Sequence, residues 1–179
     1  MSISRQNLTA IIVTFKSENV IHDCIRSIDK EVKIIVVDNS NDLKFKENLE
    51  KKYSNVTCIL SKKNLGMGAG NNLGIKNSST DFVFILNPDV ILQPNALEEI
   101  ITSSRQIESY GIIAPMEINQ KYPNYKLFNN SNFELGSIDP FKVLSVDGYA
   151  MILNLKKLGT KENFYYFDEN FFMYLENDD

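Results

Sequence analysis

Short, largely apolar runs rich in β-branched residues recur along the chain, and they limit its possible folds more than any other feature. The four clearest runs are residues 8–13, 32–37, 56–60 and 82–86. A run of this kind is typical of a strand buried on both faces of a parallel sheet. Segments with apolar residues at helical spacing separate the runs. The alternation predicts a single α/β domain with a mostly parallel central sheet flanked by helices.

Three segments have the pattern of helices. Residues 20–28 carry apolar side chains at helical spacing, and Ser17 is placed as their N-cap. Residues 43–53 predict a charged surface helix. Pro94 suits the first position of a further helix. That helix is expected to bury Leu97, Ile100, Ile101 and Ile107 and to stop at Gly111.

Residues 64–75 are rich in glycine and asparagine, and we expect a loop there that runs into a short helix. Such a loop could bring backbone N–H groups close to an anion. Its spacing matches neither the dinucleotide fingerprint nor the P-loop, so a plain connecting loop is the favoured interpretation.

The second half of the chain is less regular. Residues 112–114 and 146–153 each predict a strand. Between them, residues 116–145 lose periodicity and gain Pro, Asn and Gly, which favours a long irregular loop with room for one short strand. The aromatic-rich residues 164–175 then precede an acidic end, residues 176–179.

Charge and cysteine content exclude several classes of protein. A net charge of -4 offers no basic surface for a nucleic-acid backbone. The two cysteines, Cys24 and Cys58, are predicted to be reduced core residues, and they lack metal-ligand spacing. The N-terminus lacks a signal-peptide layout, and no apolar run approaches membrane-spanning length. These features favour a cytoplasmic protein that does not bind nucleic acid.

Polar residues follow the predicted strands at the edge where open α/β sheets bind ligands. Asp38 closes the second run, where it could accept hydrogen bonds from a ribose or a base, or form a turn. Asp89 ends the sequence Asn-Pro-Asp after the fourth run, and Pro88 stiffens that turn. One carboxylate beside substrate phosphates is enough to hold Mg²⁺ or Mn²⁺, so Asp89 is the candidate metal ligand.

Three carboxylates lie at the end of the chain, on Glu176, Asp178 and Asp179. They are candidates for a general base that deprotonates an acceptor hydroxyl. A solvated acidic tail is the alternative, but the aromatic residues before it favour a group held near the core. His22, the only histidine, is expected to pack rather than to catalyse.

Six motifs occur in one order along the chain. They are TAIIVTFKSENVIHDCIRSI, KIIVVDNSN, NLGMGAGNNLGI, DFVFILNPDV, VDGYAMIL and FDENFFMYLENDD. Together they resemble the inverting glycosyltransferases of the large family 2 type, in the rhamnosyltransferase-like branch that assembles polysaccharides. The resemblance covers essentially the whole chain and implies a single GT-A domain, a Rossmann-like nucleotide-diphospho-sugar transferase fold, over residues 1–179.

The resemblance also implies which residues contact the donor. The residues that hold the nucleotide would be Thr14, Phe15, Glu18 and Asp38. The residues near the base and diphosphate would be Asn64, Gly66, Asn71 and Asn72. Asn87 and Asp89 take the first and last positions of the family's Asp-x-Asp metal motif, and Asp147 and Gly148 lie on the donor-sugar side.

The end of the chain departs from the family pattern. Its residues 176–179 resemble a Glu-Asp-x-Asp motif whose second position usually provides the catalytic base, but Asn177 stands there. Either Glu176, Asp178 or Asp179 takes the role, or the chain is catalytically impaired. The family continues past this motif with an acceptor-binding region, so we expect the chain to be part of a longer protein.

The resemblance implies inverting, metal-assisted transfer of a sugar from a nucleotide diphosphate donor to a hydroxyl of a growing glycan. dTDP-rhamnose or a UDP-sugar is the expected donor, and a glycan or lipid-linked glycan the acceptor. A homo-oligomer and peripheral association of the full-length protein with the inner face of the membrane are compatible with it. The alternative is a non-catalytic nucleotide-sugar-binding module or inactive fragment. A nucleotidyltransferase would need a basic, glycine-rich loop that residues 14–18 lack.

Overall fold

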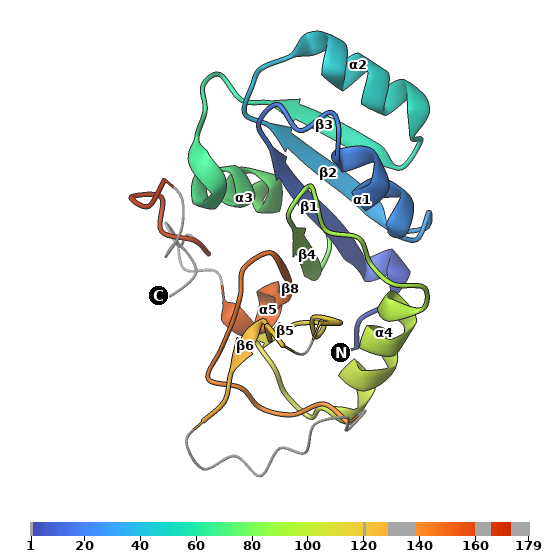
Figure 1. The fold of residues 1–179 in the computed structure, drawn as a ribbon, viewed down its shortest axis with the longest axis vertical. Coiled ribbons are helices and arrows are strands. Elements are labelled where there is room, and N and C mark those ends of the chain that lie inside the picture. Colours follow the sequence, from blue (N-terminus) through green and yellow to red (C-terminus); the bar gives the residue numbers. More distant parts are fainter. Residues whose placement is uncertain (1, 120, 129–138, 160–165, 173–179) are drawn as a thin grey trace.

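The computed structural model describes residues 2–119, 121–128, 139–159 and 166–172. Figure 1 shows the helices and strands of the chain. In chain order they are a 3-10 turn Arg5–Asn7, β1 Leu8–Thr14, α1 Ile21–Ser27, β2 Lys33–Asp38, α2 Leu43–Lys52, β3 Val56–Leu60, α3 Gly66–Lys76, β4 Phe82–Leu86, α4 Ala96–Gln106, β5 Ile112–Ile113, β6 Tyr125–Lys126, β7 Ser145–Val146, β8 Ala150–Asn154 and α5 Leu155–Leu158.

The central sheet has six strands in the order β3-β2-β1-β4-β8-β5. The strands β3, β2, β1 and β4 are parallel to one another, and they are the four apolar runs of the sequence. Every residue of β1 and of β4 is buried, as expected for strands covered on both faces. The predicted α/β fold with a mostly parallel sheet is therefore confirmed, although β8 runs antiparallel to both β4 and β5.

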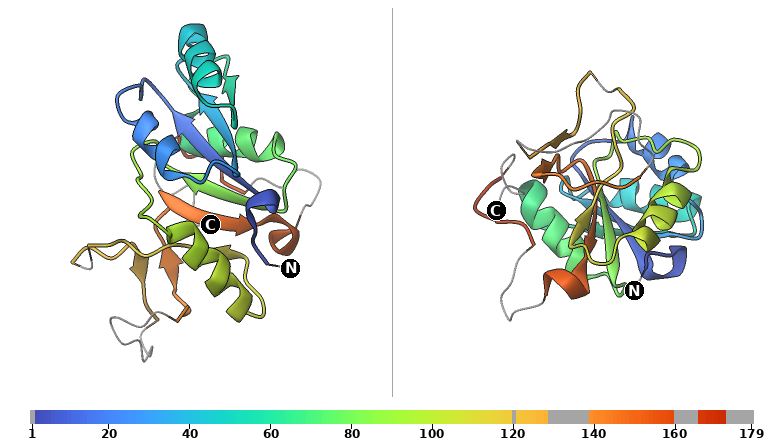
Figure 2. Two further views of the ribbon diagram at one scale, coloured as in Figure 1. Left: turned by 90° about the vertical axis from the view of Figure 1, so that its right-hand side faces the viewer. Right: turned by 90° about the horizontal axis from the view of Figure 1, so that it is seen from below.

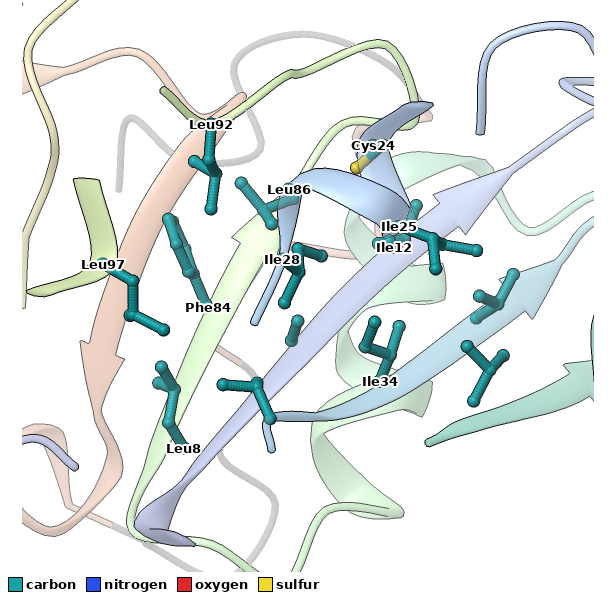
Figure 3. Packing of buried hydrophobic residues seen from close by; sticks show 14 of the residues in the cluster. Leu8, Ile12, Cys24, Ile25, Ile28, Ile34, Phe84, Leu86, Leu92 and Leu97 are labelled. Carbon is teal, nitrogen blue, oxygen red and sulfur yellow. The ribbon is translucent and has the colours of Figure 1, made fainter. Parts of the chain in front are cut away.

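Helices cover both faces of this sheet, which gives three layers. On one face, side chains of α1, α2 and α4 pack with Ile12 and Phe84 in the largest core cluster. Figure 3 shows Cys24 of α1 and Leu97 of α4 on this side of the strands. On the other face lies α3 (Figure 2, right-hand view). Phe167 joins the core on that face.

The helix α3 is longer than the sequence predicts. It begins at Gly66, so residues expected to form a glycine-rich loop are helical. A Cβ atom at Gly70 would lie 2.7 Å from Cγ1 of Val13, and one at Gly74 would lie 2.5 Å from Cγ2 of Ile11. These two glycines therefore let α3 lie directly on β1. The prediction failed because glycine has a low helix propensity, which this packing overrides.

The start of α1 also differs from the prediction. The helix begins at Ile21 with Val20 at its N-cap position, and no side chain caps it. The backbone oxygen of Ser17 accepts hydrogen bonds from the amides of Val20 and Ile21, both at 3.1 Å. Ser17 was therefore wrong as a side-chain cap, because the chain makes a further turn between it and the helix.

The start of α4 is the third correction. Pro94 lies before the helix, in a turn that the Ala96 amide closes on the Gln93 carbonyl at 3.0 Å. Asn95 completes this turn with a φ of 69°, a left-handed conformation that asparagine tolerates. The proline thus stiffens a turn that leads into α4 rather than occupying its first position.

The predicted strand over residues 146–153 is broken in two. Its first part, β7, pairs with β6 in a separate two-stranded ribbon, and β8 begins at Ala150. Because β8 is antiparallel to β4, its beginning lies beside the end of β4, where the Asn87 amide donates to the Tyr149 carbonyl at 2.9 Å. The break therefore brings Asp147 and Gly148 to the edge at which the parallel strands end.

The predictions for the cysteines and for the histidine agree with the structure. Cys24 and Cys58 are both buried, free thiols. His22 packs beside Tyr53, with its Nδ1 atom 3.1 Å from the tyrosine hydroxyl. No helix in the described parts of the chain is both long and apolar enough to cross a lipid bilayer.

Candidate functional site

The carboxyl ends of β1, β2 and β4 form one edge of the sheet, and ligands of open α/β sheets bind at this kind of edge. Thr14 and Asp38 end β1 and β2 and are paired in register. On the other side of β1, Ile12 is paired with Leu86 at the end of β4. The fold therefore brings together the segments after these three strands, which the sequence singled out as polar.

The Asp38 side chain is fully buried and organises the turn after β2. Its Oδ1 atom accepts from the Thr14 hydroxyl at 3.3 Å and from the Ser40 amide and hydroxyl at 3.1 and 2.6 Å. Its Oδ2 atom accepts from the Asp42 amide at 2.8 Å. Asp38 therefore does form the turn that the sequence offered as one of its two roles. Its Oδ2 atom keeps one further acceptor position for a ligand.

Asn39 is a buried polar residue at this edge that sequence reasoning missed. It is 5% exposed, and its Nδ2 atom donates to the Gly66 carbonyl at 3.0 Å. Its Oδ1 atom has no hydrogen-bond partner among the described residues. A buried acceptor without a partner calls for an explanation, and a ligand donor at this edge supplies one. Only its position directly after Asp38 could have indicated it from sequence.

The segment after β4 is a tight turn that presents Asp89 to solvent. The Val90 amide donates to the Asn87 carbonyl at 3.2 Å, so Pro88 and Asp89 are its central residues. The Cys24 thiol lies beneath the turn and donates to the same carbonyl at 3.6 Å. Asp89 is exposed, and no hydrogen bond or ion pair links its carboxylate to another described residue. This carboxylate is available to an external ligand.

The donor set at this turn fits a hard divalent cation bound together with a diphosphate. Such an ion takes oxygen ligands and needs only one or two protein carboxylates when phosphates complete its shell. Asp89 offers one, held on a proline-stiffened backbone. No group of three or more His, Cys, Asp or Glu side chains suited to a metal occurs in the described ranges. The turn therefore suits an ion that arrives with its substrate better than a resident structural metal.

Asp147 and Gly148 lie between β7 and β8, beside the end of β4. The Asp147 amide donates to the Asn124 carbonyl at 2.9 Å, while its side chain is exposed. The next residue but one, Tyr149, donates its hydroxyl to Oε2 of Glu117 at 3.0 Å. Burial, the Glu117 carboxylate and the Asp147 charge all raise the pKa of Tyr149, so this phenol stays protonated as a donor.

The loop after β1 places two of the predicted nucleotide contacts at the surface. Phe15 is 50% exposed, and Glu18 is exposed as well. Between them, Lys16 has a φ of 55°, and its ammonium lies 5.5 Å from the centre of the Phe15 ring. An exposed aromatic ring beside the buried pair Thr14 and Asp38 offers a flat surface on which a base can stack.

The start of α3 holds three further predicted contacts. Gly66 has a φ of 81°, and its amide donates to Oδ1 of Asn64 at 3.1 Å. Asn71 is 3% exposed, and its Oδ1 atom has no hydrogen-bond partner in the part of the chain described. The glycine and both asparagines thus remain predicted donor contacts.

The Asn72 side chain is occupied within the protein. Its amide makes four hydrogen bonds, all of them to Tyr166, Phe167 and Glu169. The structure thus ties α3 to a segment 95 residues later in the chain. The candidate base residues Glu176, Asp178 and Asp179 lie outside the described residues, so their role stays a prediction.

Comparison with known proteins identifies the family. Residues 9–167 match the family model described as Glycosyl transferase family 2. The chain belongs to this family. Two curated proteins similar to this family 2 chain are the low-salt glycan biosynthesis hexosyltransferase Agl10 of Haloferax volcanii and the poly(ribitol-phosphate) beta-N-acetylglucosaminyltransferase TarP of Staphylococcus aureus.

The first is 31% identical over 119 residues, which cover 64% of this chain and 38% of that protein. The second is 32% identical over 105 residues, which cover 58% of this chain and 32% of that protein. The family 2 chain thus spans well under half the length of these curated relatives.

Solved structures confirm the fold. S. aureus TarS 1-349 in complex with UDP has a TM-score of 0.64 at 18% identity, covering 96% of this family 2 chain and 52% of that one. The mannosyltransferase PcManGT from Pyrobaculum calidifontis, in complex with GDP-Man and Mn²⁺, has a TM-score of 0.60 at 12% identity. The match covers 87% of this chain and 47% of that one. The likeness supports the predicted GT-A fold, and the rhamnosyltransferase-like branch stays a prediction.

Proposed function

We propose that this chain binds a nucleotide diphosphate sugar and catalyses its inverting transfer to a hydroxyl group of a glycan. The observation that carries the proposal is the exposed Asp89 carboxylate, held on the turn after β4 at the ligand-binding edge of a family 2 domain. The donors to test first are UDP-sugars, because a UDP complex is among the similar structures, and dTDP-rhamnose, which the sequence resemblance implies.

The nucleoside lies on the β1 and β2 side of the edge in this proposal. Asn39 offers its unpartnered Oδ1 atom, and Asp38 its remaining acceptor position, to the N–H and O–H donors of a base and ribose. The exposed ring of Phe15 stacks on the base. These residues bind and orient the donor, and they take no part in proton transfer.

The diphosphate lies over the turn after β4. Asp89 would hold a Mg²⁺ or Mn²⁺ ion there, and PcManGT was crystallised with GDP-Man and Mn²⁺. When bound, the ion offsets the negative charge that develops on the leaving diphosphate. Asn87, whose backbone joins the turn to Tyr149, sets the position of Asp89 relative to Asp147 on the proposed sugar side.

The sugar and its acceptor lie beyond this turn in the proposal. Asp147 is exposed and held by Asn124, so its carboxylate can accept hydrogen bonds from sugar hydroxyls. Inversion requires the acceptor oxygen to attack from the face opposite the diphosphate. Its proton passes to one of the three terminal carboxylates, on Glu176, Asp178 or Asp179.

The proposal is tested by titration calorimetry of the complete protein with UDP-GlcNAc, dTDP-rhamnose and GDP-mannose, with and without Mn²⁺. A transfer assay on the donor that binds best accompanies it. We expect Mn²⁺-dependent binding of one donor class and formation of a product with inverted anomeric configuration. Failure of all three donors to bind, or a retained configuration, would contradict the proposal.

A second candidate is a nucleotide-sugar-binding module without activity. Asn177 favours it, because it stands where the family usually has its base and has no useful proton affinity. The two candidates give different results in the same experiment. Binding of a donor without transfer or donor hydrolysis supports the module, whereas turnover with inversion supports the enzyme.

A further inference from the structure

Residues 166–172, the anchored segment, lie against α3 and are held at two places. Near its start, Tyr166, Phe167 and Glu169 contact Asn72. At its end, the Phe172 carbonyl accepts from the Met67 amide at 3.1 Å. The buried Phe167 ring fills the core on this face of the sheet, in the same cluster as Ile75 of α3. The anchored segment is thus bonded to α3 at both places and packs with it on the same face of the sheet.

The Asn72 amide uses its complete hydrogen-bonding capacity at the first place. Its Nδ2 atom donates to the Phe167 carbonyl at 2.8 Å and to Oε1 of Glu169 at 3.0 Å. Its Oδ1 atom accepts from the amides of Tyr166 and Phe167 at 3.1 and 3.2 Å. An amide has two donor hydrogens and two acceptor positions, so none is left for a ligand. The two bonds to Phe167 are buried, and those to Tyr166 and Glu169 are partly buried.

The second place allows little movement. A Cβ atom at Gly66 would lie 2.2 Å from the Phe172 carbonyl oxygen, so only glycine admits the segment this closely. The Gly66 carbonyl in turn accepts from Asn39, the residue after Asp38. The end of the anchored segment is therefore fixed relative to the edge at which the donor is proposed to bind.

Asn72 itself is set back from that edge. It comes six residues after Gly66, which places it about 9 Å further along the helix axis. The groove that it lines also includes Thr80 and Asp81, at the opposite end of β4 from the Asp89 turn. The Asn72 amide has no free hydrogen-bonding position, and it lies away from the donor edge. Both facts argue against a contact with the donor diphosphate.

We propose that Asn72 is a positioning residue for the transfer step, which acts by fixing the anchored segment on α3. This inference rests on the proposed function. Glu176 comes four positions after Phe172, and four positions of chain span at most about 14 Å. Fixing Phe172 therefore restricts where the candidate bases can lie. Misplacement of a catalytic group by about 1 Å can cost on the order of 10²-fold in rate, so the anchor should affect kcat rather than donor affinity.

Four variants of the complete protein test this role. Asn72→Asp keeps the acceptor for Tyr166 and Phe167 but loses both donors and places a carboxylate against Glu169. Glu169→Gln keeps an acceptor for Asn72. The double variant Asn72→Asp/Glu169→Gln restores the hydrogen bond with its direction reversed. Asn77→Ala is the matched control, because the side chain of this exposed asparagine at the end of α3 makes one hydrogen bond among the described residues, to the Leu73 carbonyl at 2.8 Å.

The measurements are kcat, the donor KM, and the donor Kd by calorimetry. We expect Asn72→Asp to lower kcat by about 10- to 100-fold with the donor Kd changed less than about twofold. Glu169→Gln and Asn77→Ala should stay near wild type, and the double variant should recover at least part of the lost kcat. A weaker donor Kd at unchanged kcat would instead assign Asn72 to the donor site and overturn the inference.

Hydrogen exchange separates failure of this inference from failure of the proposed function. In Asn72→Ala, the Tyr166 and Phe167 amides lose their shared acceptor and should exchange at least about tenfold faster than in wild type. Unchanged exchange overturns the anchor even in an active enzyme. If the anchor is confirmed by exchange but no donor is transferred by the wild type, the proposed function fails, and with it the assignment of Asn72 to the transfer step.

Discussion

Asp38 and Asp89 both follow a buried parallel strand at the same edge of the sheet, yet the two carboxylates have opposite surroundings. Asp38 is fully buried and accepts four hydrogen bonds from Thr14, Ser40 and Asp42. Asp89 is exposed, and no described residue bonds its carboxylate. The difference comes from the turns. The turn after β2 folds back over its aspartate, whereas Pro88 directs the other turn outward. One carboxylate therefore stabilises the edge, and the other is available for a ligand.

The largest expected effect is the loss of activity in Asp89→Ala. If this carboxylate holds the metal beside the diphosphate, metal-dependent transfer should fall by at least about 10³-fold. The melting temperature should not change, because the side chain is exposed and unbonded. Asp81→Ala is the control, since Asp81 lies at the other end of β4 and pairs with exposed Lys156. Equal activity in wild type and Asp89→Ala would remove Asp89 from the mechanism.

The second prediction is that substitution of Asp38 lowers the stability of the fold, which substitution of Asp89 should not do. Asp38→Ala leaves the Thr14 and Ser40 hydroxyls and the Ser40 and Asp42 amides without their acceptor. We expect the free energy of unfolding to fall by about 3 kcal/mol, measured by denaturant titration. Asp38→Asn should cost less, because an amide oxygen can replace Oδ1. If Asp38→Ala is as stable as Asp89→Ala, the contrast between the two carboxylates is wrong.

A smaller effect is expected for Thr14→Val, which removes one donor to Asp38. The bond is long at 3.3 Å, so we expect a loss of about 1 kcal/mol in the free energy of unfolding. Because the carboxylate keeps three other donors, the turn should stay intact and the donor Kd should change less than about threefold. A loss of stability equal to that of Asp38→Ala would show that the hydroxyl, rather than the turn amides, holds the carboxylate.

The smallest effect concerns two buried thiols, each with a pKa raised in part by the charge of one of these carboxylates. Burial raises the pKa of Cys24 and of Cys58 to about 12, with additional contributions from Asp89 and Asp38 respectively. Both thiols should therefore resist alkylation at pH 8 in the native protein. Asp89→Asn removes a negative charge near Cys24 and so lowers only its pKa. Site-resolved alkylation by mass spectrometry should show a modest increase at Cys24, and an equal increase at Cys58 would contradict this assignment.

The sequence predicted the strands well because β-branched apolar runs leave few alternatives. The strands β3 and β4 have the predicted bounds, β1 is one residue longer at its end, and β2 is shifted by one residue at both ends. The sequence predicted only a short helix after a glycine-rich loop and missed that α3 begins at Gly66, because glycine lowers helix propensity and its packing against Val13 and Ile11 is a tertiary contact. Nor did it predict that β8 runs antiparallel, since its apolar pattern is the same in either direction.

The candidate site was predictable where a local signal exists. The sequence Asn-Pro-Asp after a strand indicates a stiff turn, and Asp89 is indeed presented to solvent by it. The sequence Asp-Asn-Ser does not indicate that its aspartate is completely buried. The sequence therefore left Asp38 with two roles, a ligand contact or a turn residue. The bonds of Asn72 to Tyr166 and Phe167 join residues about a hundred positions apart, and no spacing within one sequence indicates such a contact.

The central claim is that a divalent cation and the donor diphosphate meet at Asp89. The most direct measurement is the electron paramagnetic resonance signal of Mn²⁺ mixed with the protein and UDP, dTDP or GDP. We predict that one nucleoside diphosphate lets wild-type protein bind Mn²⁺, that the control Asp81→Ala retains this binding, and that Asp89→Ala abolishes it. Undiminished Mn²⁺ binding by Asp89→Ala in the presence of the same nucleotide would contradict the claim.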